Sequence, residues 1–474
     1  MPRRSTALVL AMDIGSSSVR TALFTERGAR LLDTTAARSY ALKYTVDGGA
    51  ELDAAVLFRA AKSCLGETLK DRHASVIAVA GSGFWHGLLG LNANGNPATP
   101  IFTWADNRSA ADAVGLRKDF NEREIQSRTG CVLRAPFWPA KLIWLRRTNP
   151  KSFRRVAQWT SPAGWIFAQL FGTPGSSHSM ASGTGLYNLN ERAWDAELCD
   201  YCGVDPAQLD RLSDAPQASS KAYGDAKIFA AIGDGAASNL GCGADTIDRV
   251  AINIGTSAAV RVIVPRHPRL TRRLPSGLFA YVVDDDRLVI GGAISNAGNL
   301  RAWCLRELRT DDDADRTLSR ERSATDKLTI LPYLVNERAP TWPENVNATI
   351  TGLDAATNAA DIFRAATTAT YYRLAEIFDA LGPTIPPLAH VIVSGGVLQS
   401  PASLRILADC LGRDIRVSAE LESSLRGAAI YALERFGRDV DPLPLGRNVR
   451  HRPSLTQKHC ERRRRQTELE RLLS

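Results

Sequence analysis

Hydrophobic residues along the chain follow two kinds of pattern. Short apolar runs of strand length, such as "ALVLA" (residues 7–11) and "VIAVAG" (residues 76–81), are bounded by glycine, hydroxyl and acidic residues. A longer segment, residues 53–69, has its apolar positions at helical spacing, and Asp53 stands where an N-cap would be. Strands and helices that alternate in this way predict an α/β fold.

One pattern occurs twice, about half a chain apart. The first copy is "MDIGSSSVR" (residues 12–20) and the second is "INIGTSAAV" (residues 252–260). Each has the order apolar, polar, Ile, Gly, hydroxyl, hydroxyl, and each stands between two strand-like runs. The repeat predicts two similar domains, each with a hairpin at a cleft between them. We expect these domains over residues 1–245 and 246–440, followed by a basic tail over residues 441–474.

Composition and charge narrow the class of protein. The chain has 474 residues, of which 44% are hydrophobic, and a net charge of +9. No apolar run approaches the ~20 residues that span a bilayer, so we expect no membrane partner. The basic clusters at residues 266–273 and 461–465 lack interleaved aromatic residues, which favours solvated surface and no nucleic-acid partner. Eight scattered cysteines and no export signal predict a cytoplasmic protein.

Three interpretations of residues 12–20 are open: the end of a signal peptide, a polar turn and a phosphate-binding loop. The apolar run before Asp13 is too short for a signal peptide. A turn would need only the glycine and serines. In a phosphate loop, backbone N–H groups and hydroxyls would face phosphate, Asp13 would lie near a bound Mg²⁺, and Arg20 would add positive charge. The segment lacks the Gly-Lys-Ser/Thr of a Walker loop.

A second acidic residue follows an apolar run in a glycine-rich segment. In "IGDGAASNLGCG" (residues 232–243), Asp234 lies between two glycines and before small residues that can start a closely packed helix. Asp234 is therefore either a helix N-cap or a general base that faces the cleft. Phosphoryl transfer to a hydroxyl needs one carboxylate to accept the hydroxyl proton, so Asp234 is the candidate base.

Aromatic and polar residues gather between residues 81 and 109. Trp85, His86, Trp104 and Asp106 stand near predicted strand ends. A polyhydroxylated substrate needs such a mixture, because flat aromatic faces cover its C–H surfaces and polar groups bind its hydroxyls. A histidine by itself is as often structural, but the cluster favours a binding role for His86.

The order of these pieces resembles the FGGY family of carbohydrate kinases, within the actin-like ATPase superfamily. Seven pieces carry the resemblance: "MDIGSSSVR", "FWHGLLGLNANGNPATPIFTWADNRS", "IGDGAASNLGCG", "INIGTS", "GGAISNAGN", "LPYLVNERAP" and "SGGVLQSPASLRILADCLG". The resemblance implies two actin-like ATPase domains, of ribonuclease H-like α/β fold, with a cleft between them. It also implies ATP and Mg²⁺ as cofactors and a small-molecule sugar or sugar acid as partner, and it leaves a homodimer open.

The resemblance further implies a role for each motif residue. Asp234 would be the catalytic base, and Asp13 would hold Mg²⁺ through water. The nucleotide would be bound by Gly15, Ser16, Ser17, Arg20, Gly255, Thr256, Gly298, Gly396 and Ser400. The sugar would be bound by Trp85, His86, Trp104, Asp106 and Asp234.

The motifs look more like those of gluconate kinases than those of glycerol kinases, which usually carry Arg-Glu in place of Trp85 and His86. We therefore expect phosphorylation of D-gluconate to 6-phosphogluconate. Xylulose kinases share the His-Gly pair and are the nearest alternative, with other pentulose and polyol kinases. His178, Arg405 and the Ala-Gly pair at residues 163–164 depart from the common family pattern, so the motifs leave the sugar identity open.

Two other classes share the fold that the resemblance implies. One is a non-catalytic, sugar-binding actin-like protein, and the retention of Asp13, Asp234 and both hairpins argues against it. The other is a chaperone-like ATPase, which would not need the aromatic and histidine cluster. Fold alone does not decide among these classes, so the residues of the site must.

Overall fold

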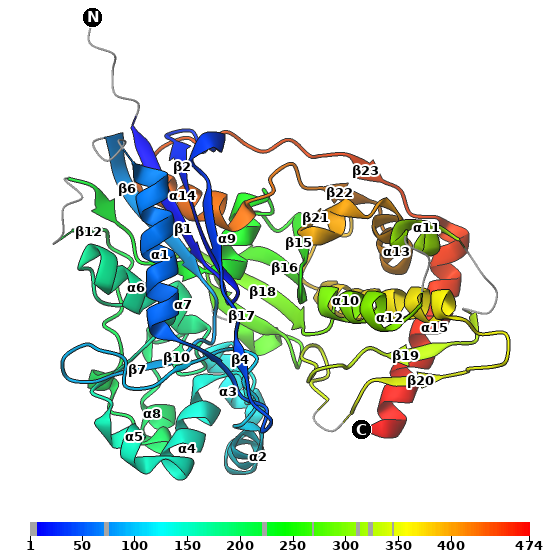
Figure 1. The fold of residues 1–474 in the computed structure, drawn as a ribbon, viewed down its shortest axis with the longest axis horizontal. Coiled ribbons are helices and arrows are strands. Elements are labelled where there is room, and N and C mark those ends of the chain that lie inside the picture. Colours follow the sequence, from blue (N-terminus) through cyan, green and yellow to red (C-terminus); the bar gives the residue numbers. More distant parts are fainter. Residues whose placement is uncertain are drawn as a thin grey trace, which may run out of the picture.

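Two mixed β-sheets, one for each half of the repeat, form the centres of the molecule (Figure 1). The computed structural model describes residues 7–70, 75–219, 225–267, 270–309, 313–320, 326–343 and 346–474. The first sheet has the order β12-β13-β6-β1-β2-β3, with β14 paired to β6. Its strands are β1 (Leu8–Ile14), β2 (Ser18–Thr25), β3 (Ala36–Ser39), β6 (Val76–Gly83), β12 (Gln217–Ala218), β13 (Lys227–Ile228) and β14 (Ile232–Gly233).

The second sheet repeats the central arrangement of the first. It has the order β17-β18-β16-β15-β21-β22-β23. In each sheet a central strand, β1 or β15, pairs antiparallel with the next strand of its hairpin and parallel with a later strand, β6 or β21. The predicted α/β fold of two similar domains is thereby confirmed. The strands are β15 (Arg249–Ile254), β16 (Ala258–Pro265), β17 (Phe279–Val282), β18 (Arg287–Ile294), β21 (His390–Ser394), β22 (Ile415–Val417) and β23 (Asn448–Val449).

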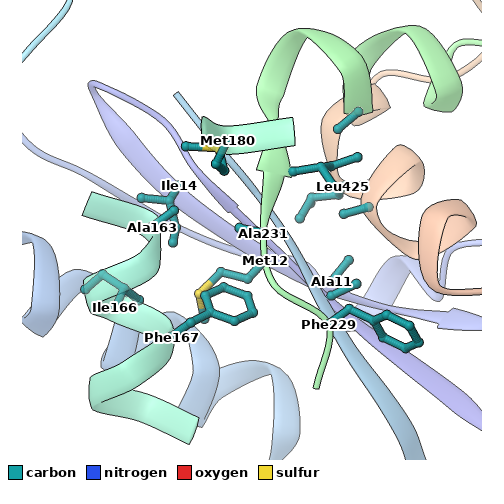
Figure 2. Close-up of a cluster of buried hydrophobic side chains, with 14 of the residues drawn as sticks. Ala11, Met12, Ile14, Ala163, Ile166, Phe167, Met180, Phe229, Ala231 and Leu425 are labelled. Atoms are coloured by element: carbon teal, nitrogen blue, oxygen red, sulfur yellow. The ribbon is translucent and has the colours of Figure 1, made fainter. Parts of the chain in front are cut away.

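Helices pack on the first sheet from both halves of the chain. The predicted helix is α1 (Ala54–Leu69), and Asp53 caps it by accepting hydrogen bonds from the N–H groups of Ala55 and Val56. α6 (Pro162–Phe171) lies close to β6, because a Cβ at Gly81 would stand only 2.4 Å from the Phe167 ring. Figure 2 shows Ala163, Ile166 and Phe167 of α6 packed beside Met12 and Ile14 of β1, with Leu425 of α14 nearby.

One helix from the second half of the sequence belongs spatially to the first sheet. α14 (Ser423–Arg435) packs on β1, β6 and α9 (Asp234–Gly241) (Figure 1). A Cβ at Gly427 would stand 1.7 Å from the Ala237 carbonyl oxygen, so these two helices touch backbone to backbone. A division of the chain at residue 245 does not foresee this return, because the contact depends on distant parts of the sequence.

The predicted basic tail is packed more closely than a peripheral segment. β23 extends the second sheet, and α15 (Pro453–Leu473) lies against α12 (Ala359–Leu381) and α13 (Pro401–Leu411). Glu470 is 4% exposed and pairs at 2.7 Å with Arg373, which is fully buried. Glu470 also accepts a hydrogen bond from Thr341, so α15 helps to hold the segment that contains Thr341. This face of α15 is therefore buried, whereas the basic cluster at residues 461–465, predicted as solvated surface, is exposed or half-buried.

Smaller elements complete the two halves. Among the described residues, no helix is long and apolar enough to cross a membrane. The remaining strands are β4 (Lys43–Tyr44), β5 (Ala50–Leu52), β7 (Leu89–Leu91), β8 (Ile101–Phe102), β9 (Gln158–Thr160), β10 (Tyr187–Asn188), β11 (Ala193–Trp194), β19 (Thr329–Leu331) and β20 (Thr349–Thr351). The remaining α-helices are α2 (Ala110–Asp119), α3 (Glu122–Thr129), α4 (Trp138–Thr148), α5 (Pro150–Arg155), α7 (His178–Ser182), α8 (Ala196–Cys202), α10 (Gly298–Glu307) and α11 (Ala314–Ser319).

Candidate active site

Two acidic residues lie together at the carboxyl-terminal ends of neighbouring strands in the first sheet. β1 and β6 run parallel, and Asp13 stands opposite Ser82 in their register. β14 also runs parallel to β6, with Ile232 opposite Ser82, and Asp234 follows directly after β14. The carboxyl ends of parallel strands form the usual ligand edge of such a sheet. The topology therefore brings Asp13 and Asp234 to the same site.

Asp13 is buried, and both of its carboxylate oxygens accept hydrogen bonds. Oδ1 accepts from the Ser82 hydroxyl at 2.6 Å, and Oδ2 accepts from the Arg20 guanidinium at 2.5 Å. Arg20 also donates to Glu422 at 2.6 Å. The sequence predicts that Arg20 faces phosphate, whereas in the structure its guanidinium is directed to these two carboxylates. The Asp13 carboxylate above all raises the pKa of Arg20, and Arg20 in turn orients Asp13.

Asp234 is the first residue of α9 and keeps part of its surface open. The N-cap is Gly233, so Asp234 is not the cap itself, and its Oδ1 accepts a hydrogen bond from the Gly235 N–H at 2.7 Å. Burial raises the pKa of Asp234 to about 6, the Arg261 guanidinium opposes this shift and the Asp13 carboxylate adds to it. A carboxylate with a pKa near neutrality can accept a proton from a hydroxyl.

His86 supplies a neutral hydrogen-bonding group. Its Nδ1 lies 2.6 Å from the Gly183 carbonyl oxygen. A carbonyl oxygen only accepts, so Nδ1 donates and Nε2 is left as an acceptor. Burial lowers the pKa of His86 to about 3, and the ring lies edge-on to Phe137 and Tyr281. His86 can therefore accept a hydrogen bond from a ligand hydroxyl over the whole physiological pH range.

The structure gives Trp85 a different place from the one predicted. Its side chain is 5% exposed, and its Nε1 donates to the Ser179 carbonyl oxygen at 3.0 Å. A Cβ at Gly233 would stand 1.8 Å from the indole, and one at Gly235 would stand 2.5 Å away. The indole that the sequence assigns to the sugar is thus largely covered by the protein in this structure. Trp85 instead supports the backbone on both sides of Asp234.

Asp106 is likewise occupied by the protein. It is 2% exposed, its Oδ2 accepts from Arg108 at 2.5 Å and from the Ala50 N–H at 3.2 Å, and its Oδ1 accepts from Arg108 at 3.1 Å. In this geometry Asp106, which the sequence assigns to the sugar, orders the loop that carries Trp104. Trp104 itself is partly exposed, and the Arg338 guanidinium lies 4.6 Å from its ring centroid.

Lys141 is a buried positive charge that the sequence interpretation missed. It lies in α4, is 1% exposed, and its Nζ donates to the carbonyl oxygens of His86 at 2.8 Å and Thr103 at 2.7 Å. Burial lowers its pKa to about 7. The ammonium ties together the two loops that carry His86 and Trp104. A lysine inside the apolar stretch "FWPAKLIWL" was the available signal.

Two further arginines were also missed. Arg261 stands in the middle of β16, and its Nε is buried without a hydrogen-bond partner among the described residues. Arg338 donates from Nε to the Ser295 hydroxyl at 3.1 Å and from a terminal nitrogen to the Ile294 carbonyl oxygen at 3.0 Å. Both guanidinium groups lie near enough to Asp234 to lower its pKa. A single charge within the apolar strand "AAVRVIVP" was the signal for Arg261.

The second domain contains a separate cavity of about 580 Å³, between the β15–β16 turn and helices α10, α12 and α13. Its lining includes all five second-domain residues that were assigned to the nucleotide: Gly255, Thr256, Gly298, Gly396 and Ser400. The N–H groups of Gly298 and Asn299, at the start of α10, donate to the carbonyl oxygens of Gly255 and Thr256. A helix N-terminus thus stands at the turn that repeats the first hairpin.

The first hairpin does not line this cavity. Its Gly15 N–H donates to the Ser18 carbonyl oxygen at 2.9 Å. In the second hairpin the Gly255 N–H donates to the Ser257 carbonyl oxygen, also at 2.9 Å. Ser16 is partly exposed and Ser17 is exposed at the turn. Their positions leave backbone and hydroxyl donors accessible to an anion.

The acidic residues suit a metal ion that arrives with a nucleotide. Within the part of the chain that the structure describes, no group of three or more His, Cys, Asp or Glu side chains could hold a metal ion alone. Asp13 and Asp234 supply two carboxylates at one edge. Mg²⁺ is commonly bound by one or two carboxylates together with phosphate oxygens and water. The donor set therefore fits Mg²⁺ shared with substrate phosphates.

Several known sugar kinases are similar to this chain over nearly its whole length. Gluconokinase of Bacillus subtilis (strain 168) is 28% identical over 480 residues, which cover 94% of this chain and 92% of that protein. Xylulose kinase of Staphylococcus xylosus is 23% identical and covers 90% of each chain. The crystal structure of a gluconate kinase from Lactobacillus acidophilus superposes with a TM-score of 0.88, at 23% identity, over 99% of this chain and 98% of that one.

Family models match nearly the whole chain. The N-terminal domain of the FGGY family of carbohydrate kinases matches residues 8–255, and the C-terminal domain of the same family matches residues 250–434. The two matches meet where the first domain ends and β15 begins. The chain therefore belongs to the FGGY family of carbohydrate kinases and is an ATP-dependent sugar kinase.

Proposed function

We propose that the protein transfers the γ-phosphoryl group of ATP to a hydroxyl of D-gluconate and yields 6-phosphogluconate and ADP. The observation that carries the proposal is Asp234, an accessible carboxylate of raised pKa at the strand edge that it shares with Asp13. The resemblance to two gluconokinases, each 28% identical over 94% of the chain, favours gluconate.

In the proposed reaction, Asp234 accepts the proton of the sugar hydroxyl. The hydroxyl oxygen forms a bond to the γ-phosphorus, and the bond from that phosphorus to the bridging oxygen of ADP breaks. His86 orients the sugar by accepting a hydrogen bond at Nε2. Gly15, Ser16 and Ser17 face the phosphates from one domain, and Gly255 and Thr256 do so from the other. Mg²⁺, held by Asp13 through water, would neutralise phosphate charge.

Other residues hold the proposed catalytic and binding residues in position. Arg20 and Ser82 hold the Asp13 carboxylate, and Trp85 supports the backbone around Asp234. Gly298, Gly396 and Ser400 line the pocket that we assign to adenosine. Closure of the two domains would exclude water, which limits hydrolysis of ATP.

The proposal is tested by ATP consumption with Mg²⁺ over a panel of D-gluconate, D-xylulose, L-ribulose, glycerol and erythritol. Gluconate-dependent turnover, with the product identified as the 6-phosphate by ³¹P NMR, is the expected result. Xylulose is the second candidate, since a xylulose kinase from Lactobacillus acidophilus superposes with a TM-score of 0.89. Sugar binding by calorimetry without any turnover would instead identify a non-catalytic protein.

The rate of gluconate phosphorylation should depend on pH through Asp234. The base acts only when deprotonated, and its pKa of about 6 lies above the ordinary value for Asp. We therefore expect kcat/KM for gluconate to be level above about pH 7 and to fall about tenfold for each pH unit below 6. Initial rates at saturating ATP measure this profile. A level profile down to about pH 5 would contradict the assignment, because the free carboxylate would then titrate elsewhere.

The nucleotide pocket should be sensitive to a single methyl group at Gly298. Its N–H donates to the Gly255 carbonyl oxygen at 3.0 Å, and a Cβ would stand 2.4 Å from that same oxygen. Gly298→Ala should force α10 away from the turn and weaken ATP binding by about tenfold or more. Calorimetric titration with ATP measures the change. Gly66→Ala in α1, where the new Cβ meets no atom within 4 Å, is the control, and equal affinities in both variants would refute the assignment.

A further inference from the structure

Arg261 is held in an unusual environment for a guanidinium. Val260 and Val262, its neighbours on β16, are fully buried. Its own side chain lies against the backbone beside Asp234: a Cβ at Gly235 would stand 2.7 Å from Nε and 2.9 Å from Cζ. Nε has no hydrogen-bond partner among the described residues. A buried donor without an acceptor is rare in native proteins and calls for an explanation, such as an absent ligand.

Arg338 lies close enough to Arg261 and Asp234 for their charges to act on it. Its two hydrogen-bond acceptors, the Ser295 hydroxyl and the Ile294 carbonyl oxygen, are uncharged. Its guanidinium lies over Trp104, with 4.6 Å between Cζ and the ring centroid. Hydrogen bonds on one edge fix the plane of the guanidinium and leave donors on the other edge for a ligand.

Two acidic groups, Asp234 and Glu337, act on these two arginines. Asp13 is already paired with Arg20, and Glu337 accepts from the Ser295 N–H and from the Asn296 amide. Burial also raises the pKa of Glu337. The other neighbours, His86 and Tyr281, are neutral at physiological pH.

Glu337 is 3% exposed, so Asp234 is the carboxylate among the described residues that acts on both guanidiniums and keeps part of its surface open. Burial lowers the pKa of Arg261, and it lowers that of Arg338 to about 10. Both shifts arise chiefly from burial, which disfavours the charged guanidinium, and nearby carboxylates oppose them. A ligand carboxylate would supply the acceptor that the Arg261 Nε lacks among the described residues.

We propose that Arg261 and Arg338 together bind the carboxylate of the sugar substrate and so restrict the enzyme to sugar acids; this inference rests on the proposed kinase function. A carboxylate matches the fork of a guanidinium and can accept from both arginines at once. A neutral sugar would leave both charges desolvated when the domains close, so it would be rejected. Because the two guanidiniums come from different elements, the subsite requires both.

A competing role for the same residues is contact with the transferring phosphoryl group, which also attracts arginine. The two roles predict different results. An arginine that contacts the phosphoryl group lowers turnover of every substrate alike. An arginine that binds the sugar carboxylate matters only for substrates that have one.

The experiment compares D-gluconate with D-gluconamide, in which an uncharged amide replaces the carboxylate, in wild type, Arg261→Met and Arg338→Met. Phosphorylation rates give kcat/KM, and calorimetry gives the Kd of each sugar without turnover. Arg287→Met is the control, since Arg287 stands on β18 of the same sheet and pairs with Asp284 and Glu434. We expect wild type to prefer gluconate by about 100-fold or more, and each site variant to lose most of that preference.

The Arg287→Met control should change neither kcat/KM nor Kd by more than about threefold. Equal losses for gluconate and gluconamide in the site variants would overturn the inference and favour the phosphoryl role. Turnover of a neutral sugar with no binding of gluconate would overturn it while leaving the kinase activity intact. If no sugar is phosphorylated, the kinase proposal fails by itself, and the calorimetric preference for gluconate in wild type, lost in the variants, still decides the carboxylate subsite.

Discussion

Asp234→Asn is expected to lower kcat for the sugar by about 1000-fold or more, with little change in the KM of either substrate. An amide has nearly the shape of the carboxylate and can still accept the Gly235 N–H bond, so α9 should stay in place. It cannot take a proton from the hydroxyl. The loss therefore measures proton transfer rather than folding, and steady-state kinetics with thermal melting of both proteins test it.

Asp210 offers a matched control for this variant. Burial raises the pKa of Asp210 to about 6 as well, but its carboxylate accepts from Thr160 and Gln158 at the edge of β9. Asp210→Asn should retain most of kcat. If both variants lost activity to the same degree, the effect would report buried carboxylates in general, and the assignment of Asp234 as base would be refuted.

Asp13→Asn should lower kcat by about 100-fold or more and raise the Mg²⁺ concentration needed for half-maximal rate. Asp13 is the acidic residue of β1, and an amide in its place would neither attract the cation nor form an ion pair with Arg20. Gluconate binding should be unchanged, since Asp13 lies on the phosphate side of the proposed site. Rates over a Mg²⁺ titration, together with calorimetry of the sugar, separate the two effects.

Asp112→Asn is the corresponding control. Asp112 is also nearly buried and binds an arginine, Arg147, through two hydrogen bonds at 3.0 and 2.9 Å, but on α2. It tests whether loss of any Asp–Arg pair slows the enzyme. A Mg²⁺ dependence in Asp13→Asn that matched wild type would exclude a metal role for Asp13.

Short stretches of sequence were sufficient to predict the hairpins, helices and strands that depend on neighbouring residues. The two glycine-hydroxyl hairpins, the helix after Asp53 and the buried strand before Gly83 could all be predicted, since each depends on a short run of residues. The return of α14 to the first sheet could not, because a helical pattern shows which face is apolar and not which sheet covers it.

The site was predicted unevenly for a similar reason. Asp13 and Asp234 were found because each is an acidic residue that interrupts an apolar run shortly before glycine. Trp85 and Asp106 were placed in the sugar site because sequence shows residue type but not orientation, and both turn out to face the protein. Arg261 could not be assigned to the site from sequence, because no motif surrounds it. Its role depends on its closeness to Asp234, which belongs to the other domain.

The return of α14 sets an order for events on the ribosome. Leu425, Ala428, Ala429 and Leu433 are fully buried on the side of the first sheet, whose last strand, β14, ends at Gly233, roughly 190 residues before α14 begins. At about 5–20 residues per second, the first sheet waits roughly 10–40 s for the helix that covers it. During that time an apolar surface stays open beside the emerging chain. The nascent protein should therefore need a chaperone most while its second domain is being made.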